Sequence, residues 1–312
     1  RGGGGYPGAH LAGISSALRA TLGLASFARK IIGVKGVEKI GPALHSVGLP
    51  LWTPSLPKPY NPAALVARTE AQPAAPEKPK VVYFPSCLNR TMGIAENAPR
   101  AEEPLSEVFV RLCERAGYEV IFPEGLPSLC CGMIWSSKGM PDIAESKVRE
   151  LEAALAQASQ GGRFPVVCDQ SPCLHRMRKC ITSMKLFEPA EFIHDFLAPS
   201  LTFRPVDRPV AVHITCSSRM MGIGDKIVAL ASMCSTNVTV PPEVGCCGFA
   251  GDKGFTIPEL NSWGLRKLRK SVEEAGAKEG YSNSRTCEIG LTTNSGIPYQ
   301  SIVYLVDEVT RP

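Results

Sequence analysis

The chain has 312 residues, of which 44% are hydrophobic and 20% are charged, a composition typical of a globular protein with a sizeable core. Its net charge of +5 comes from residues 1–57, which hold six Lys and Arg and one acid, whereas the remainder holds 28 basic and 28 acidic residues. This neutral body argues against nucleic-acid binding. No run of 18 or more apolar residues occurs, so the sequence predicts no transmembrane helix.

The first eighty residues are predicted to form a helical segment, 1–52, and a Pro-rich linker, 53–80. Apolar residues spaced along 11–32 predict a helix with basic residues outside its apolar stripe. We expect it to pack on protein rather than on a membrane surface, because glycines interrupt the stripe. Residues 53–80 contain seven prolines, which favours an extended linker.

From residue 81 onward, short apolar runs alternate with helical patterns. The first half has predicted strands at 81–85, 119–122 and 164–167 and predicted helices at 105–116 and 143–159, and the second half copies this order from residue 210 to a closing helix at 299–308. The alternation predicts an α/β fold of two pseudo-repeated βαβ-type, Rossmann-like units with parallel sheets. We place these units at 81–200 and 201–312.

Two stretches of the chain repeat each other around cysteine. Cys-Leu-Asn-Arg-Thr-Met-Gly begins at Cys87, and Cys-Ser-Ser-Arg-Met-Met-Gly begins at Cys216. Each stretch is followed by Cys-Cys-Gly, then by Lys-Gly, and then by a further cysteine. Nearly every motif cysteine follows a predicted strand, and in open α/β sheets ligands bind beyond the carboxyl ends of the strands. Because the repeated residues are thiols, we infer that the duplicated unit binds metal.

The twelve cysteines are most simply explained as iron–sulfur ligands. Vicinal cysteines and this chain length fit disulfides poorly, the paired knuckles of structural zinc sites are absent, and so is the cubane signature. An iron–sulfur site of a less common type remains, against the alternative of inert buried thiols. The candidate ligands are Cys87, Cys130, Cys131, Cys168, Cys173, Cys216, Cys246, Cys247 and Cys287. Cys113 and Cys234 are predicted to lie in helix cores, and Cys180 is left unassigned.

Charged residues and glycines repeat in register with these thiols. Arg90 and Arg219 follow the first cysteine of each half, and Lys138 and Lys253 follow the pairs. We predict that these four contact cluster sulfides or a substrate anion, with ordinary surface charge as the alternative. The glycines after the pairs, Gly132 and Gly248, are expected to let the backbone pass close to a cluster. His213 and His175 are predicted to be structural histidines, not ligands.

On these motifs the chain resembles the cysteine-rich CCG domain family. That family occurs in heterodisulfide reductases, in iron–sulfur subunits of glycolate and L-lactate oxidation systems, and in fused flavin and iron–sulfur D-lactate dehydrogenases. Residues 49–54, 84–87, 246–251 and 284–290 are most similar to the carboxy-terminal third of the fused enzymes.

The resemblance implies one or two [4Fe–4S] clusters, of cubane or non-cubane form. One would be held by Cys87, Cys130, Cys131 and Cys173, and another by Cys216, Cys246, Cys247 and Cys287. The family's closing Cys-x-x-Cys is replaced by Cys168-x-x-x-x-Cys173 in the first half, and Ser282 or Ser284 stands in its place in the second. A fifth ligand is therefore left open in both halves.

By this resemblance the chain is the iron–sulfur electron-transfer module of a flavin-dependent D-2-hydroxy-acid dehydrogenase, acting on D-lactate or glycolate. Electrons would come from FAD and ferredoxin-type modules, on the same polypeptide or a partner chain, and pass to a quinone or another acceptor. The chain has no flavin signature, and no catalytic residue is assigned. Two alternatives stay open: a thiol–disulfide reductase module with chemistry at the cluster, and an assembly or sensing module that docks a partner. The family implies the cytoplasmic face of a bacterial inner membrane, with peripheral membrane association, or mitochondria in a eukaryote.

Overall fold

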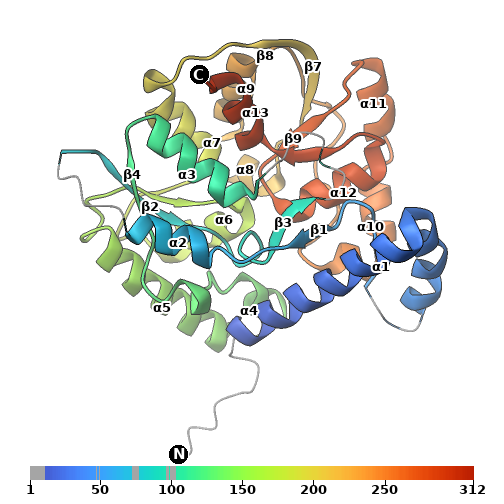
Figure 1. Ribbon diagram of the computed structural model, residues 1–312, viewed down its shortest axis with the longest axis horizontal. Coiled ribbons are helices and arrows are strands. Elements are labelled where there is room, and N and C mark those ends of the chain that lie inside the picture. Colours follow the sequence, from blue (N-terminus) through green and yellow to red (C-terminus); the bar gives the residue numbers. More distant parts are fainter. Residues whose placement is uncertain (1–10, 47, 49, 72–76, 96–97, 99–102) are drawn as a thin grey trace, which may run out of the picture.

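The two halves of the chain form two parallel sheets with the same strand order (Figure 1). The structure is a computed structural model that describes residues 11–46, 48, 50–71, 77–95, 98 and 103–312. The first sheet has the order β4 (Glu119–Ile121), β2 (Lys80–Phe84), β5 (Val166–Cys168), β6 (Leu186–Phe187). The second has the order β8 (Ser235–Thr239), β7 (Val206–Val212), β9 (Gly280–Ser282), β10 (Tyr299–Ser301). All pairs within these two sheets are parallel. The predicted α/β fold with two Rossmann-like units is confirmed.

Helices cover the sheets and connect the parallel strands. In the first half they are α3 (Leu105–Arg115), α4 (Met133–Ser137), α5 (Pro141–Ala158), α6 (Ser171–Cys180) and α7 (Pro189–Phe192). In the second half they are α8 (Cys216–Met220), α9 (Gly224–Cys234), α10 (Pro258–Gly264), α11 (Leu268–Glu274), α12 (Arg285–Ser295) and α13 (Ile302–Thr310). Helix α3 shows why these segments fold: Leu105, Val108, Phe109 and Leu112 form one buried stripe, and Gly117 with a φ of 85° follows the helix end.

The strands read as continuous apolar runs because both faces of each sheet are covered. In β2 the residues Val81–Phe84 are at most 1% exposed. One hydrophobic cluster contains Phe84 and Leu151 of the first half together with Val212 and Val306 of the second. The two units therefore share a core. The short strands β6 and β10 were not predicted, and β10 occupies the start of what the sequence predicted as a closing helix.

The last helix of each half packs against the other half. Helix α13 packs against α3, and α7 packs against α9. Asp307 of α13 accepts hydrogen bonds from Arg111 at 3.0 Å and from Arg115 at 2.9 Å. The equivalent contact in the other direction joins Lys226 of α9 to Glu191, 3.5 Å apart. Each half thus supplies a helix and an ion pair to its neighbour.

The N-terminal segment is more ordered than the sequence indicated. Helix α1 (Leu11–Ser46) extends beyond the predicted 11–32 and kinks at Gly33, where φ is 70°. The proline-rich segment contains β1 (Pro57–Pro59), which pairs antiparallel with β3 (Met92–Ala95), and α2 (Ala63–Glu70). It is therefore not a simple extended linker.

One helix passes the length and composition test for a membrane span, which the sequence analysis did not predict. Within the described part of the chain, α1 alone is long and apolar enough to span one, and 11% of its most apolar window is buried. A single such helix near an N-terminus is weak evidence, since signal sequences pass the same test.

Replacing Asp307 with Asn should destabilise the contact between the halves. Burial raises the pKa of Asp307, but hydrogen bonds and charge from Arg111, Arg311 and Arg115 outweigh it and hold the pKa below its usual value. The carboxylate's stabilisation is therefore present above its ordinary pKa and lost as the pH falls below it. We expect the free energy of unfolding to drop by about 2 kcal/mol at pH 7. Urea denaturation at pH 7 and in acid measures this drop, which should shrink in acid.

The matched control is Glu274→Gln, which breaks the exposed pair between Lys270 and Glu274 on α11, 3.7 Å apart. Exposed pairs contribute little, so we expect less than about 0.5 kcal/mol. Equal losses for the two variants would contradict the role given to Asp307.

Candidate metal centre

The first set of thiols meets beyond the carboxyl ends of the strands of the first sheet. Cys87 follows β2, the adjacent pair Cys130 and Cys131 follows β4, and Cys173 lies in the first turn of α6 after β5. Their thiols interact with one another in a series that runs Cys87–Cys130–Cys131–Cys173. Because all four strands are parallel, these distant residues reach one edge of the sheet.

The second set repeats this arrangement on the second sheet. Cys216 opens α8 after β7, Cys246 and Cys247 follow β8, and Cys287 lies in the first turn of α12 after β9. The series runs Cys216–Cys246–Cys247–Cys287, and the Sγ atoms of Cys247 and Cys287 are 3.1 Å apart. The structure thus brings together the same four positions in each half.

The two sets differ in their access to solvent. In the first set Cys130, Cys131 and Cys173 are buried, and contact with Cys131 together with burial raises the pKa of Cys130 to about 12. In the second set Cys216 and Cys246 are exposed. Hydrogen bonds from the Cys216 and Cys247 thiols and from the Gly248 N–H lower the pKa of Cys246. The first site is enclosed, and the second opens to water on one side.

Cys168 lies near the first set but outside its series of contacts. It is the last residue of β5 and is fully buried. Its counterpart is Ser282, the last residue of β9, which donates to the carbonyl of His213 at 3.2 Å. Ser284 instead accepts a hydrogen bond from Gln170 at 2.9 Å. The strand-end thiol of the first half is therefore replaced by Ser282 in the second.

The side chains of Arg90 and Arg219 donate hydrogen bonds to backbone carbonyls just before the cysteine pairs. Arg90 donates to the Leu129 carbonyl at 2.5 Å, and Arg219 donates to the carbonyls of Val244 and Gly245 at 3.0 and 2.8 Å. These carbonyls immediately precede the pairs, and a turn carbonyl without a sheet partner needs a donor. The predicted contact with cluster sulfides stays a prediction: among the described residues the buried Nε of Arg90 has no hydrogen-bond partner, and the charge of Arg90 acts on Cys87 and Cys130.

The two lysines lie at the surface. Lys138 pairs with Asp252 of the other half at 2.6 Å, and both side chains are exposed. Lys253 is exposed at the start of the turn Lys253–Phe255. Lys138 therefore links the segments that follow the two Cys-Cys-Gly motifs. Both lysines have the environment of ordinary surface charges.

Each pair is followed by a glycine that no other residue can replace without strain. Gly132 has a φ of 77°, and a Cβ there would lie 2.5 Å from the carbonyl oxygen of Ala144 in α5. Gly248 has a φ of 70°, and a Cβ there would lie 2.2 Å from the carbonyl oxygen of Leu260 in α10. The close approach is therefore to α5 in the first half and to α10 in the second, and the predicted approach to a cluster stays a prediction.

His213 and Asp169 matter more to the site than the sequence indicated. His213 follows β7 and is 2% exposed, and its Nε2 has no hydrogen-bond partner in the described structure. Burial and the charge of Arg219 lower its pKa to about 4, so the ring is neutral. The expectation of a satisfied core histidine was wrong. The first half has Phe84 at this position, and that departure from the repeat was the available signal.

Asp169 follows β5 and fixes the start of the first motif. Its carboxylate accepts from the Tyr83 hydroxyl at 2.6 Å and from the Ser86 N–H at 2.7 Å. Asn89 donates to the Asp169 carbonyl at 3.0 Å and accepts from Arg285 of the second half at 3.2 Å. A buried polar network therefore joins the residues around Cys87 to the helix that carries Cys287.

Three residues were predicted to have structural roles outside the metal centre. His175 is half-buried on α6, and Cys113 and Cys234 are buried in helices.

The donor chemistry of the two thiol sets is that of iron–sulfur ligands. Among the described residues, no three His, Cys, Asp or Glu side chains surround a position for one metal ion, and all twelve cysteines are free thiols. Four soft sulfur donors at one sheet edge are the ligand chemistry that iron–sulfur clusters use. The residues that would hold such clusters are the two sets of four.

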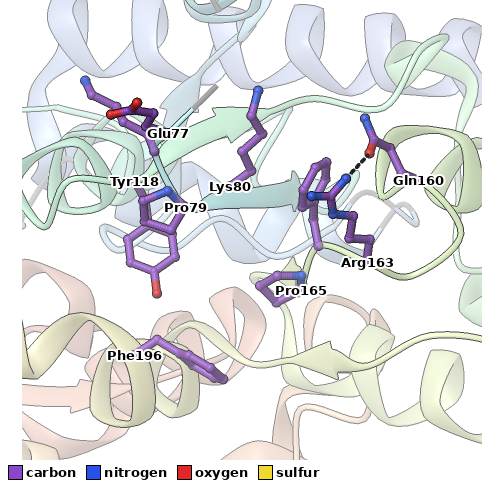
Figure 2. Close-up of a pocket in the computed structure, with 10 residues that line it drawn as sticks. Glu77, Pro79, Lys80, Tyr118, Gln160, Arg163, Pro165 and Phe196 are labelled. Atoms are coloured by element: carbon purple, nitrogen blue, oxygen red, sulfur yellow. Dashed lines mark hydrogen bonds between the residues drawn. The ribbon is translucent and has the colours of Figure 1, made fainter. Parts of the chain in front are cut away.

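A cavity elsewhere in the molecule contains no cysteine. It measures about 560 Å³ and lies at the opposite, amino-terminal ends of the first sheet's strands (Figure 2). Lys80 at the start of β2, Tyr118 before β4 and Pro165 before β5 line it, and Phe196 closes one side. Lys80 is paired there with Glu119 at 2.9 Å. The candidate metal centre is therefore separate from this cavity.

The comparison with protein families agrees with the geometry of the thiols. The sequence profile of the CCG cysteine-rich domain matches residues 81–178 and 210–292, one match in each half. The chain belongs to the CCG cysteine-rich domain family.

Curated relatives match the chain at low identity. The Lactate utilization protein A 1 of Bacillus mycoides is 23% identical over 206 residues, which cover 61% of this chain and 83% of the relative. The Lactate utilization protein A of Bacillus licheniformis is 24% identical over 211 residues, covering 64% and 84%. Among solved structures, the aspartate racemase of Picrophilus torridus aligns with 10% identity and a TM-score of 0.32, covering 74% of this chain and 90% of that one. A likeness at this level carries no argument about function.

Replacing Gly132 or Gly248 with Ala should destabilise the protein far more than replacing Gly139. Gly139 has a φ of 75° but nothing within 4 Å of the added Cβ, so Gly139→Ala measures the cost of the backbone conformation alone, about 1 kcal/mol. The clash with a helix carbonyl should add roughly 2 kcal/mol at Gly132 or Gly248. Urea denaturation of the three variants tests this. Similar losses for all three would show that the helices do not constrain the pairs.

Proposed function

We propose that this chain is an iron–sulfur electron-transfer module in the oxidation of D-lactate or a related 2-hydroxy acid, as part of an FAD and iron–sulfur dehydrogenase. The observation that carries the proposal is the duplicated set of four thiols at equivalent strand ends. The relatives, named for lactate utilization, support the metabolic setting. The flavin and ferredoxin-type modules would lie on the same polypeptide or a partner, and a quinone or another acceptor would take the electrons.

Within this function, a cluster would supply storage for single electrons, and the chain supplies its surroundings. Burial keeps water away from Cys130, Cys131 and Cys173, and Arg90 brings a positive charge beside the first set. Such charge and burial are the means by which proteins set cluster potentials. The exposed side of the second set, at Cys216 and Cys246, is where a partner could approach most closely.

The same exposed side supports a second candidate, a thiol–disulfide reductase module. Cys216 and Cys246 are exposed and their thiols interact with each other, so a disulfide could reach them. In that function a disulfide substrate would react at the second site. Reduction of a small disulfide that requires Cys216 and Cys246 would favour this function over electron transfer alone.

Iron and acid-labile sulfide analysis of the anaerobically purified chain, with electron paramagnetic resonance, tests the proposal. We expect about four irons for each complete set and a redox-active signal. Cys130→Ser should remove the iron of the first set, and Cys246→Ser that of the second. Cys113→Ser, at a buried thiol of α3 outside both sets, is the matched control and should keep the full content. Purified protein without iron, or equal content in all variants, would overturn the proposal.

We propose further that α1 contacts an anionic membrane surface. Leu24, Phe27 and Ile31 are 71%, 62% and 66% exposed, and their spacing places them on one face of the helix. The same helix carries five Lys and Arg and one acid. Helix α1 runs along one edge of the molecule (Figure 1), and an apolar cavity of about 400 Å³ lies between it and the residues around Trp52 and Phe255. This arrangement suits a cytoplasmic or mitochondrial protein that associates peripherally with a membrane.

Vesicle flotation with the full chain checks the role of α1. The chain should float with vesicles rich in phosphatidylglycerol and not with pure phosphatidylcholine. Replacing Leu24, Phe27 and Ile31 together with Ser should reduce flotation at least tenfold, because each exposed apolar side chain contributes about 1.5 kcal/mol on burial. Trp263→Ser is the control, since Trp263 is 70% exposed on α10. Unchanged flotation of the triple variant would assign the face to a neighbouring protein module.

A further inference from the structure

The two thiol sets are equivalent in topology but differ in one residue beside them. Three residues before the first motif cysteine, the first half has Phe84 and the second half has His213. Phe84 lies under the guanidinium of Arg90, with 5.7 Å from Cζ to the ring centre. The charge of the equivalent arginine, Arg219, acts on the ring of His213. An apolar ring in one site is thus replaced by an imidazole in the other.

The backbone of His213 is held firmly at the end of the second sheet. Its N–H donates to the Tyr281 carbonyl at 2.8 Å, and its carbonyl accepts from Ser282 at 3.2 Å. Ser282 stands where the first half has Cys168, so the hydroxyl that replaces a thiol is used to fix His213. The ring therefore has a defined position at the edge where Cys216 begins.

The imidazole is buried with one nitrogen unused. His213 is 2% exposed, and Nε2 has no partner among the described residues. A buried donor or acceptor without a partner destabilises the folded state. The charged groups that face the ring are Cys246 and Arg219, and the guanidinium of Arg219 is already bonded to the Val244 and Gly245 carbonyls. The thiol set is the remaining polar neighbour.

We propose that Nε2 of His213 donates a hydrogen bond to a sulfur of the second site when that site holds its cluster. This inference rests on the proposed function. A donor to a cluster sulfur stabilises the reduced, more negative state, which raises the reduction potential. The first site has only Phe84 at this position. His213 is therefore a positioning residue that raises the potential of the second site.

A redox titration of the full chain followed by electron paramagnetic resonance tests this inference. His213→Phe gives the second site the residue that the first site has. The reduction potential of the second site should become more negative by ~59 mV, which corresponds to a tenfold change in the one-electron equilibrium constant. His213→Gln keeps an N–H donor and should restore most of the shift. The first-site potential should be unchanged in both variants. His175→Phe on α6 is the control and should leave the second-site potential where it was.

A direct measurement on the unmodified residue covers the case in which the variants fold poorly. Labelling the histidines with ¹⁵N should produce a nitrogen hyperfine coupling in the second-site signal that survives His175→Phe. Iron-loaded protein with no such coupling, or with an unchanged second-site potential in His213→Phe, would overturn the role of His213 and leave the proposed function standing. Protein without iron would instead overturn the proposed function itself.

Discussion

The left-handed glycine behind each cysteine pair is the constraint on which the sites depend. Gly132 and Gly248 turn the chain sharply after two adjacent cysteines and allow the next helix backbone to press against the turn. The arginines Arg90 and Arg219 then fix the turn from the other side through the carbonyls that precede each pair. With both sides held, the pair can face the strand-end cysteines of its own sheet. A side chain in place of the glycine would displace the helix or the thiols.

The duplication also explains how two small sheets make one stable body. Neither half covers itself completely, because its last helix packs on the other half, as α13 does on α3 and α7 does on α9. Charged contacts follow the same exchange, with Asp307 held by Arg111 and Arg115. A polar network that includes Asn89, Asp169 and Arg285 fills the boundary between the motifs. Because Asn89 and Arg285 are both buried, the hydrogen bond between them forms only when both halves are present.

The two thiol sites differ in their exposure and in the residues beside them. The first site is enclosed by its own side chains, and the second is open at Cys216 and Cys246. Where the first site has Phe84 and Cys168, the second site has His213 and Ser282. Two sites with the same thiols but different burial and hydrogen-bond donors would have different potentials. A pair of unequal sites suits transfer between a donor module on one side and an acceptor on the other.

The sequence alone determined the class of fold and nine candidate thiols, and the resemblance to the CCG family grouped eight of them into two sets of four. Alternating apolar runs and helical patterns identify parallel sheets, and the repeated Cys-Cys-Gly shows which residues gather at the strand ends. These features depend on neighbours in the chain, so local patterns reveal them. The sequence analysis did not predict the short strands β6 and β10, because a strand of two or three residues is too short to show a hydrophobic period.

Only the tertiary structure decided what surrounds the thiols. It showed that Arg90 and Arg219 bond to backbone carbonyls, that Gly132 and Gly248 face helices, that Ser282 is the counterpart of Cys168, and that Nε2 of His213 has no partner in the described residues. Each of these facts is a contact between residues far apart in sequence. Hydrogen-bond direction and burial depend on how the helices pack over the sheets, and no spacing along the chain encodes that packing.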